Sequence, residues 1–467
     1  MKKGSRLSVL FLFLALCGVA LAQQPSPTPI AAVPPTGKTP IIIIPGLTGS
    51  DLYNSKTGEE VWFKSKRSKV DDLRLPMSAN LARNRDNLVT RDILRSVKVF
   101  KFLPETEIYE RLIHALETRG GYREAKWATA TKDDYQDTFY VFPYDWRRDN
   151  VENAQLLIRR IETLKRKLGK PSLKFNIIAH SMGGLISRYA AMYGDTEIPA
   201  GQPKPTWAGA KNFDKIFLLG TPNAGSVSAL NALLNGYGYV GGGVNIPFVQ
   251  DLDRFDVFTI PSSFQLLPHE GSLIVYDEEM KPITLDVYDP ATWDEYDWSI
   301  WKDPNFAKKF SAVEQRNARP YFLAALARAK RLQTALDANT LEKAPVSFYL
   351  MGAECKETLN AMLVYRNTKK DRWEAVFKGE TINLANGGKI PDQQMKSLLF
   401  SKGDGVVPKR SLTMESIIAG GKKNVLPYTA ELYQCEGHNK LITNQEIQDK
   451  LFLLLRDAAA STATTPK

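Results

Sequence analysis

The sequence Ala-His-Ser-Met-Gly at 179–183 places a serine, Ser181, between two patterned segments. An apolar run at 175–178 has the character of a buried strand, and a helical pattern at 185–193 follows the serine. A serine at such a strand-to-helix turn is lifted above the strand end, where its hydroxyl can attack a carbonyl carbon. The backbones nearly collide there, so the residues two before and two after the serine must be small, as they are here. We predict that Ser181 is a nucleophile.

A serine hydroxyl is a poor nucleophile until a base removes its proton. Where a nucleophile sits on this kind of turn, the chain order is serine, then acid, then histidine. Of the four histidines, His114 precedes the serine, His180 is its neighbour and cannot turn back to it, and His269 comes before any convincing acid. His438 is left as the base, between a strand-like run at 429–433 and the last helical pattern.

The acid is expected in the sequence Gly-Asp-Gly-Val-Val-Pro at 403–408. An aspartate between two glycines sits on a tight turn, with its carboxylate free to leave the backbone. Its task would be to hold the imidazole in the right tautomer and to stabilise the imidazolium. An Asp-Gly turn without chemistry is the alternative, because such turns are common. We predict that Asp404 is the acid.

The tetrahedral intermediate of an acyl transfer needs two backbone N–H donors. One is expected from the residue after the nucleophile, Met182. The other is expected from the loop after the first strand, where Gly-Leu-Thr-Gly-Ser follows Pro45, and Leu47 is our choice. The alternative is that the Pro-Gly pair at 45–46 only ends a strand.

Strand and helix patterns alternate along the chain in the way that a parallel sheet requires. Short apolar runs rich in β-branched and aromatic residues predict strands at 40–44, 138–142, 175–178, 216–219 and 346–352. Helical patterns lie between them, one with leucines and isoleucines on one face between 157 and 168. The pattern predicts an α/β fold, a mostly parallel, doubly wound sheet with helices on both faces and a large inserted cap and lid. Together with the serine turn, this is the architecture of the α/β-hydrolase fold.

The strand pattern is broken between 226 and 345, which we interpret as the cap insertion. It contains a glycine-rich stretch at 236–243, an acidic and aromatic stretch at 288–298, and a helical pattern at 321–336. The tryptophans of the acidic stretch either pack the cap or contact substrate. The predicted boundaries follow: core at 39–225 with a lid segment at about 55–100, cap at 226–345, second part of the core at 346–458, and a disordered tail at 459–467.

The N-terminal residues predict export from the cytoplasm. Lys2, Lys3 and Arg6 precede an apolar run that ends in Ala20-Leu21-Ala22, the three parts of a signal peptide at 1–22. An uncleaved anchor is the alternative, and a lipoprotein site at Cys17 ranks lower because a bulky leucine precedes it. A proline-rich spacer follows at 23–38. The mature protein is expected to be secreted, periplasmic or bound to the cell surface.

The formal charge falls from +11 to +8 when the three cations of the signal peptide are removed. The remaining cations lie in separate clusters, at 64–69, 165–167 and 369–372, without the aromatic or glycine pattern of nucleic-acid modules. We expect no nucleic-acid partner. Attraction to anionic lipid head groups is the functional interpretation, and solvated surface is the alternative. We expect no metal and no cofactor.

Two cysteines follow the signal peptide, Cys355 and Cys435. Each follows a predicted strand, and those two strands should be neighbours with both loops at the catalytic edge. In an oxidising compartment the two thiols could pair and pin the loop of His438. Two separate half-buried thiols are the alternative, because disulfide geometry is strict.

A set of ordered sequence blocks resembles the lecithin:cholesterol acyltransferase family, which includes lysosomal phospholipase A2 and the phospholipid:diacylglycerol acyltransferases. The blocks run from the first strand to the last helix, and the second and sixth are the most specific. They are Pro45–Ser50, Pro143–Arg147, Ala179–Gly184, Leu219–Pro222, Ser263–Pro268, Gly403–Pro408 and Gly437–His438.

The resemblance implies an acyl enzyme on Ser181, drawn from a lipid ester at a lipid or membrane surface and passed to water or an alcohol. It also implies a lid and cap over an acyl channel, with Trp62, Thr48 and Tyr144 as tentative lid or substrate residues. Trp62 beside basic residues could dip into a lipid interface; a buried ring under a basic loop is the favoured alternative. Animal members have a disulfide-pinned lid, and no cysteine lies near Trp62.

The leading hypothesis is a serine-dependent lipid acyl hydrolase or acyltransferase. A second is an esterase of other esters, such as a polyester or a lactone. A third is an envelope binding protein that kept the fold without the chemistry, against which the ordered serine, acid and histidine argue.

Overall fold

The computed structural model describes residues 37–64, 72–97, 106–237, 252–269, 271–338, 344–384, 387–418, 421–424 and 426–456. The predicted signal peptide, most of the spacer, most of the glycine-rich stretch and the C-terminal tail lie outside these ranges. No helix in the described ranges is long and apolar enough to cross a bilayer.

A seven-stranded sheet forms the centre of the fold, in the order β22-β13-β10-β9-β1-β8-β7, and every neighbouring pair is parallel. The strands are β1 (Ile41–Ile44), β7 (Arg123–Glu124), β8 (Thr138–Val141), β9 (Phe175–His180), β10 (Phe213–Leu219), β13 (Ser347–Gly352) and β22 (Ala430–Tyr433). The predicted strands are confirmed, each within a few residues of its expected bounds.

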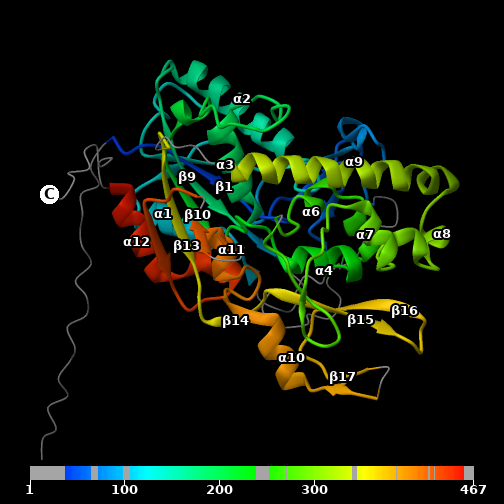
Figure 1. Cartoon of the computed structure of the whole chain (residues 1–467). Helices are drawn as coiled ribbons and strands as arrows, with labels where there is room; N and C mark the ends of the chain where they lie inside the picture. The colour runs from blue at the N-terminus through cyan, green and yellow to red at the C-terminus, as the bar shows by residue number, and fades with distance from the viewer. Residues whose placement is uncertain are drawn as a thin grey trace, which may run out of the picture. The chain divides into compact units, whose positions relative to one another are not determined.

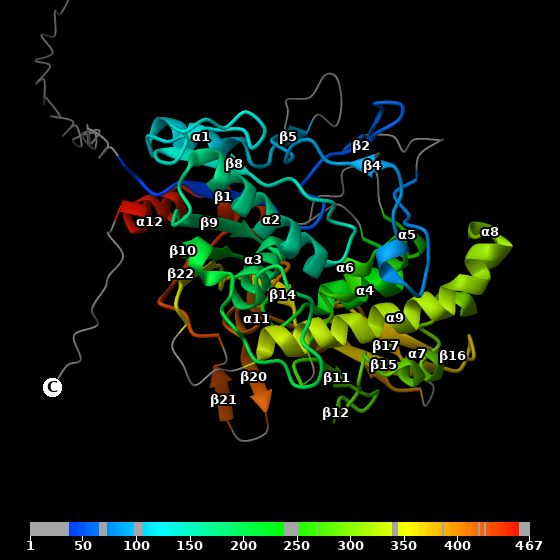
Figure 2. The same ribbon diagram turned by 90° about the horizontal axis from the view of Figure 1, so that it is seen from above.

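The sheet is covered by helices on both faces, as the apolar runs predict. Strand β1 is four isoleucines, all buried, and alternate side chains enter different cores. Ile42 and Ile44 pack with α2 (Asn150–Leu168) and α3 (Met182–Tyr193), whereas Ile41 and Ile43 pack with α1 (Glu110–Thr118) and α12 (Gln445–Arg456). The two views show these helix pairs on opposite sides of the strands (Figures 1 and 2).

The cap between β10 and β13 is mainly helical. Its helices are α4 (Val227–Asn235), α5 (Arg254–Phe258), α6 (Pro261–Phe264), α7 (Pro290–Glu295), α8 (Phe306–Lys309) and α9 (Ala312–Asp337). The longest, α9, crosses the cap from α8 to α3 (Figure 1). It begins nine residues before the predicted 321, at a capping box formed by Ser311 and Glu314, and Pro320 lies inside it. The capping box starts the helix upstream of this proline.

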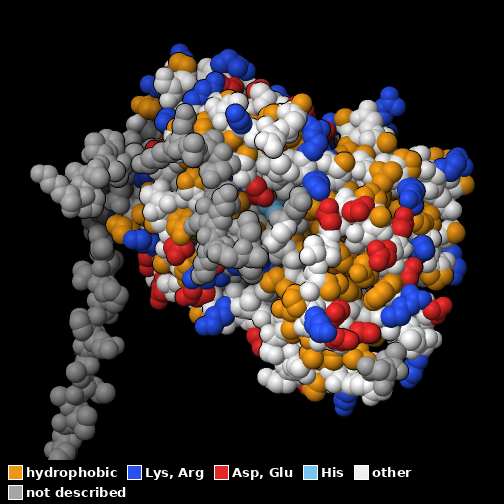
Figure 3. All heavy atoms as spheres, in the orientation of Figure 1, with side chains coloured by type: hydrophobic (Ala, Val, Ile, Leu, Met, Phe, Trp, Pro, Cys, Tyr) orange, Lys and Arg blue, Asp and Glu red, His pale blue; other side chains and the backbone are white. Residues whose placement is uncertain are grey.

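The aromatic side chains of the cap pack against one another. Trp293 and Trp298 are 2% and 4% exposed, and Phe322 stacks on Phe258 and contacts Trp293. The tryptophans of the acidic stretch are therefore packing residues of the cap in this structure. Hydrophobic side chains also gather on the cap surface over α4, α7 and β15 (Figure 3).

One sheet has strands on both sides of the predicted boundary at 345. The cap also contains a sheet, β12-β11-β15-β16, in which β11 (Ile274–Tyr276) pairs with β12 (Pro282–Ile283) on one side and with a later strand, β15, on the other. The partner strands, β15 (Ala361–Asn367) and β16 (Arg372–Val376), come after β13 and fall in the range assigned to the core. The buried start of β15, Ala-Met-Leu-Val, adds an apolar strand to the cap.

Smaller elements connect these layers. Beside the catalytic edge lie β2 (Leu52–Asn54), β3 (Glu60–Trp62), β4 (Leu88–Val89), β5 (Ser96–Val97) and β6 (Thr106–Glu107). Along the chain between the core strands β13 and β22, and outside the cap sheet, lie β14 (Lys356–Leu359), β17 (Ile382–Asn383), β18 (Lys389–Ile390), α10 (Asp392–Leu399), β19 (Phe400–Gly403), α11 (Lys409–Thr413), β20 (Glu415–Ile418) and β21 (Gly421–Asn424). Four 3-10 helices complete the set: Leu81–Arg83, Ala210–Asn212, Ile300–Lys302 and His438–Thr443.

The described part of the predicted lid segment is tied to the core by one buried guanidinium. Arg147 is fully buried and donates to both carboxylate oxygens of Asp86, at 2.6 and 2.9 Å, and to Asp145. It also reaches the carbonyl oxygen of Leu73 at 3.3 Å. The N–H groups of a guanidinium are coplanar, so a bidentate pair of this kind sets the orientation of the carboxylate as well as attracting its charge. Within the Tyr-Asp-Trp-Arg block, the aspartate and the arginine therefore act together in holding this segment.

Candidate active site

Ser181 lies at a sharp turn between β9 and α3, with φ 52° and ψ −126°. A non-glycine residue rarely adopts such a positive φ, which marks a backbone held there by its surroundings. Its N–H donates to the carbonyl of Leu219 at 2.8 Å, and its own carbonyl accepts from Gly184 at 2.9 Å. The turn lifts the hydroxyl above the carboxyl end of the sheet.

Close packing explains the glycines around this turn. A Cβ atom on Gly46 would lie 2.8 Å from the Cβ of Ser181, and one on Gly183 would lie 2.5 Å from the carbonyl oxygen of Pro45. A Cβ on Gly184 would meet the Thr221 side chain at 2.0 Å. The loop after β1, the serine turn and the loop after β10 are therefore packed so closely that these positions have no room for a side chain.

His438 and Asp404 complete a linear hydrogen-bonded chain with the serine. The Nε2 atom of His438 lies 2.9 Å from Ser181 Oγ, and its Nδ1 atom lies 2.7 Å from Asp404 Oδ2. The second carboxylate oxygen accepts the N–H groups of Val406 and Val407. Because an ionised carboxylate can only accept, Nδ1 carries the proton and Nε2 is free to accept the serine O–H. The arrangement can generate an alkoxide nucleophile.

The two expected oxyanion donors are available. Met182 is the first residue of α3, so its N–H has no partner within the helix. No hydrogen bond among the described residues uses the N–H of Leu47 or that of Met182. Each donor is next to a residue with positive φ: Met182 follows Ser181, and Leu47 precedes Thr48.

The loop that carries Leu47 is held by aromatic donors. Tyr144 Oη donates to the carbonyl of Pro45 at 2.8 Å, Trp62 Nε1 to that of Thr48 at 2.9 Å, and Trp146 Nε1 to that of Ser50 at 3.2 Å. Trp62 and Tyr144 are fully buried, and Thr48 is 6% exposed. Trp62 is therefore a buried ring, as the favoured alternative expects, and does not lie at the surface in this structure. The indole and phenol groups position the loop.

His180 and Tyr109 form a second network that sequence reasoning missed. His180 Nε2 lies 3.2 Å from the carbonyl oxygen of His438, which can only accept, so Nε2 carries the proton. Nδ1 must then accept, and Tyr109 Oη, 2.9 Å away, donates to it. The same phenol oxygen accepts the N–H of Gly46 at 2.9 Å. The network joins the loop of the base to the loop of the oxyanion donors.

Burial lowers the pKa of His180 to about 3, and the nearby His438 adds to this effect. The ring is therefore neutral at physiological pH, as its two hydrogen bonds require. The sequence carried one signal for this role: a histidine directly before the nucleophile cannot reach it and must point elsewhere. Tyr109, 71 positions away, had no such signal.

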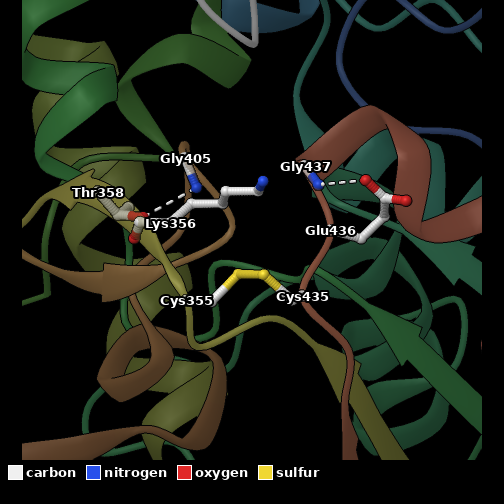
Figure 4. Close-up of a disulfide and its surroundings, with 7 residues drawn as sticks. All are labelled: Cys355, Lys356, Thr358, Gly405, Cys435, Glu436 and Gly437. Atoms are coloured by element: carbon white, nitrogen blue, oxygen red, sulfur yellow. Dashed lines mark hydrogen bonds between the residues drawn. A yellow bond between two sulfur atoms is a disulfide. The ribbon is translucent and has the colours of Figure 1, made fainter.

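A disulfide joins Cys355 to Cys435, with Cα atoms 5.4 Å apart. Figure 4 shows it between the turn of the acid and the loop of the base. On one side, Thr358 Oγ1 accepts the N–H of Gly405, next to Asp404. On the other, Cys435 lies three residues before His438. The strands that precede the two cysteines, β13 and β22, are neighbours, as expected. Within the described residues, no cluster of three or more histidine, cysteine or acidic side chains could hold a metal ion.

Comparison with known proteins identifies a family. The model of the family described as "Lecithin:cholesterol acyltransferase" matches residues 80–312, a span that contains Ser181 and most of the cap. No curated protein matches the chain in sequence.

A solved structure shares the fold, and others match with lower TM-scores. The crystal structure of the Tle4-Tli4 complex contains a chain with a TM-score of 0.51 and 13% identity, over 90% of this chain and 98% of that chain. The Bacillus licheniformis lipase BlEst2 in propeptide form has a TM-score of 0.35 and 12% identity, over 92% of this chain and 52% of the lipase. Phospholipase PlaB from Legionella pneumophila has a TM-score of 0.34 and 10% identity, over 90% and 60%. The fold is an α/β-hydrolase fold with a large cap.

The low pKa of His180 predicts an acid-sensitive fold. An unfolded histidine titrates near 6.5 and the buried one near 3, so between these values the unfolded chain binds one more proton. Stability should fall as pH is lowered through this window, by up to about 1.4 kcal/mol per pH unit from this residue. His180→Gln should make that fall shallower in denaturant titrations at several pH values. The same slope in His180→Gln and wild type would contradict the assignment; His114→Gln, at an exposed site on α1, is the control.

The disulfide predicts that the double variant Cys355→Ser/Cys435→Ser loses both stability and reactivity. A loop closed over 80 positions should contribute about 2–4 kcal/mol. Because the bridge holds the acid turn beside the base loop, reaction of the serine with a fluorophosphonate should also slow. The measurements are denaturant unfolding and labelling rate, with each single variant expected to match the double one. Unchanged values in the double variant would show that the bridge does not restrain the site.

Proposed function

Because the chain belongs to the lecithin:cholesterol acyltransferase family, which acts on acyl esters of lipids, we propose that Ser181 takes an acyl group from a phospholipid or related ester and passes it to water or an alcohol. The observation that carries this proposal is the linear chain from Ser181 Oγ through the His438 ring to Asp404. This chain is buried except at the hydroxyl end. There the N–H groups of Leu47 and Met182 have no hydrogen-bond acceptor among the described residues.

The first half of the reaction would form the acyl enzyme. Ser181 Oγ attacks the ester carbonyl while His438 Nε2 takes its proton, and Asp404 stabilises the imidazolium through Nδ1. The carbonyl oxygen gains negative charge and is met by the N–H groups of Leu47 and Met182. When the tetrahedral intermediate collapses, the C–O bond to the leaving alcohol breaks, and His438 returns the proton to that alcohol.

The second half would repeat these steps with a new nucleophile. Water or an alcohol approaches the acyl carbonyl, and His438 Nε2 takes its proton a second time. The tetrahedral intermediate then releases Ser181 Oγ, which regains its proton from the imidazolium. The products are a fatty acid or a new ester, and the acceptor alone decides which.

We also propose that the protein is exported. The disulfide supports this location, because structural disulfides persist in oxidising compartments. The predicted signal peptide lies outside the described residues.

Ser181→Ala should fold normally and lose turnover of phospholipid esters by about a thousandfold or more, because no other group forms the acyl enzyme. His438→Ala should be about as damaging, and Asp404→Asn equally or less so. Ser397→Ala and Asp392→Asn, at exposed positions on α10, are matched controls. Release of fatty acid from mixed phospholipid vesicles is the measurement. Near-normal release by Ser181→Ala would refute the mechanism, and turnover of polyester or lactone alone would refute the lipid substrate.

Hydrolysis should dominate in dilute solution, and transfer should appear when a lipid alcohol shares the interface. Water is abundant at an open serine, so an alcohol must compete by being bound and oriented. The cap tryptophans pack within the cap, which leaves no dedicated alcohol site defined by those residues. Free fatty acid and new ester would be measured from labelled phospholipid vesicles as their long-chain alcohol content rises. Ester formation above fatty-acid release at trace alcohol would show a committed transferase.

A further inference from the structure

A cavity of about 540 Å³ lies at the edge of the central sheet. Strand β7 pairs with only the first two residues of β8, so the rest of that edge lacks a strand partner from β7. Trp127 folds over it and donates from Nε1 to the carbonyl of Val141 at 2.6 Å. The space beyond is floored by Val141 and Leu164, both buried, and walled by the half-buried Trp127. The cavity is therefore apolar at its base.

Three arginines, Arg91, Arg159 and Arg160, line the same cavity. None of them has a carboxylate partner among the described residues. Arg91 stacks on Tyr53, and Arg160 stacks on Phe142 and donates to the carbonyl of Pro143.

Two acidic residues nearby, Asp92 and Glu124, are already paired with other cations, and the buried carboxylate of Asp51 accepts the backbone N–H groups of Arg91 and Asp92. Asp92, which also lines the cavity, accepts from Arg95, and Glu124 accepts from Arg95 and from Lys126, the fourth cation of the rim. Burial without a counter-ion lowers the pKa of Arg160. The rim therefore carries uncompensated positive charge, and a bound anion would relieve it.

We propose that this cavity binds the phosphate group of an anionic glycerophospholipid at a site separate from Ser181. Guanidinium groups bind phosphate oxygens through paired N–H donors, which suits three arginines around one opening. The glycerol and first acyl carbons would lie against Trp127, Val141 and Leu164. Neutral amphiphiles would leave the three charges unmet, so the site favours anionic lipid.

The position of the cavity indicates a function for the site. It lies beside the carboxyl end of β8, next to β1, whose carboxyl end carries the loop of Leu47. A phosphate held there would attach the protein to an anionic lipid surface near the catalytic edge of the sheet. The contact does not depend on acyl transfer, so binding and turnover can be tested separately.

The test uses full-length Ser181→Ala protein, which cannot consume the lipid, and vesicle flotation. Vesicles are made of phosphatidylcholine alone or of phosphatidylcholine mixed with phosphatidylglycerol. Arg159→Gln/Arg160→Gln removes two rim charges. The control, Arg83→Gln/Arg316→Gln, removes two exposed arginines from elsewhere that have no carboxylate partner among the residues the structure describes. The pocket variant should bind the mixed vesicles roughly tenfold or more weakly, and the control should change by less than about twofold.

Calorimetry with soluble glycerol phosphate distinguishes the source of the phosphate. Saturable binding lost in the pocket variant, without preference for anionic vesicles, would keep the phosphate site but overturn the lipid source. An equal loss in both double variants would show diffuse charge and overturn the site, as would no loss in either. If Arg159→Gln/Arg160→Gln does not fold, as judged by circular dichroism, Arg91→Gln/Arg159→Gln replaces it, since both side chains are exposed.

Discussion

The rest of the site depends on the contact between the ends of β1 and β9. Ser181 is held at φ 52° because the loop after β1 passes so close that no side chain fits on Gly46. The same contact that strains the serine places the loop of Leu47 beside its hydroxyl. Nucleophile and oxyanion donors are therefore set by one piece of backbone packing, and a larger residue at Gly46 or Gly183 would displace both at once.

A loop squeezed in this way must satisfy its buried polar groups by other means, because an unpaired buried carbonyl or N–H is costly. Tyr144, Trp62 and Trp146 donate to its carbonyls, and Tyr109 accepts the N–H of Gly46. The N–H of Leu47 is left without a partner within the described chain. This selective satisfaction is the physical sense of preorganisation: the donors for the transition state are already aimed, and nothing has to move to release them.

Much of this was predictable from the sequence, and the rest depended on contacts between distant residues. Strands such as 41–44 can be recognised because burial on both faces requires continuous apolar residues. Chain order singled out His438, and the Gly-Asp-Gly turn singled out Asp404. The tautomer of His180 depends on a carbonyl 258 positions away and could not be read from sequence. The lysines near Trp62 left an interfacial ring open beside the favoured buried one. The structure shows a buried ring whose Nε1–H donates to the carbonyl of Thr48. The strand at 361–367 was assigned to the core because its partner, β11, is recognised only in three dimensions.

The position of β15 in the cap sheet matters for the chemistry, because it determines the path of the chain to the acid, Asp404. After β13 the chain does not go directly to Asp404; it runs out through the cap sheet and returns by β19. The outgoing β14 and returning β19 pair antiparallel, from Lys356 opposite Gly403 to Leu359 opposite Phe400, and the disulfide fixes the start of this ladder to the loop of His438. Cap and acid thus share one excursion of the chain. The ladder and the bridge therefore hold the turn of Asp404 against the loop of His438, where Asp404 Oδ2 lies 2.7 Å from His438 Nδ1.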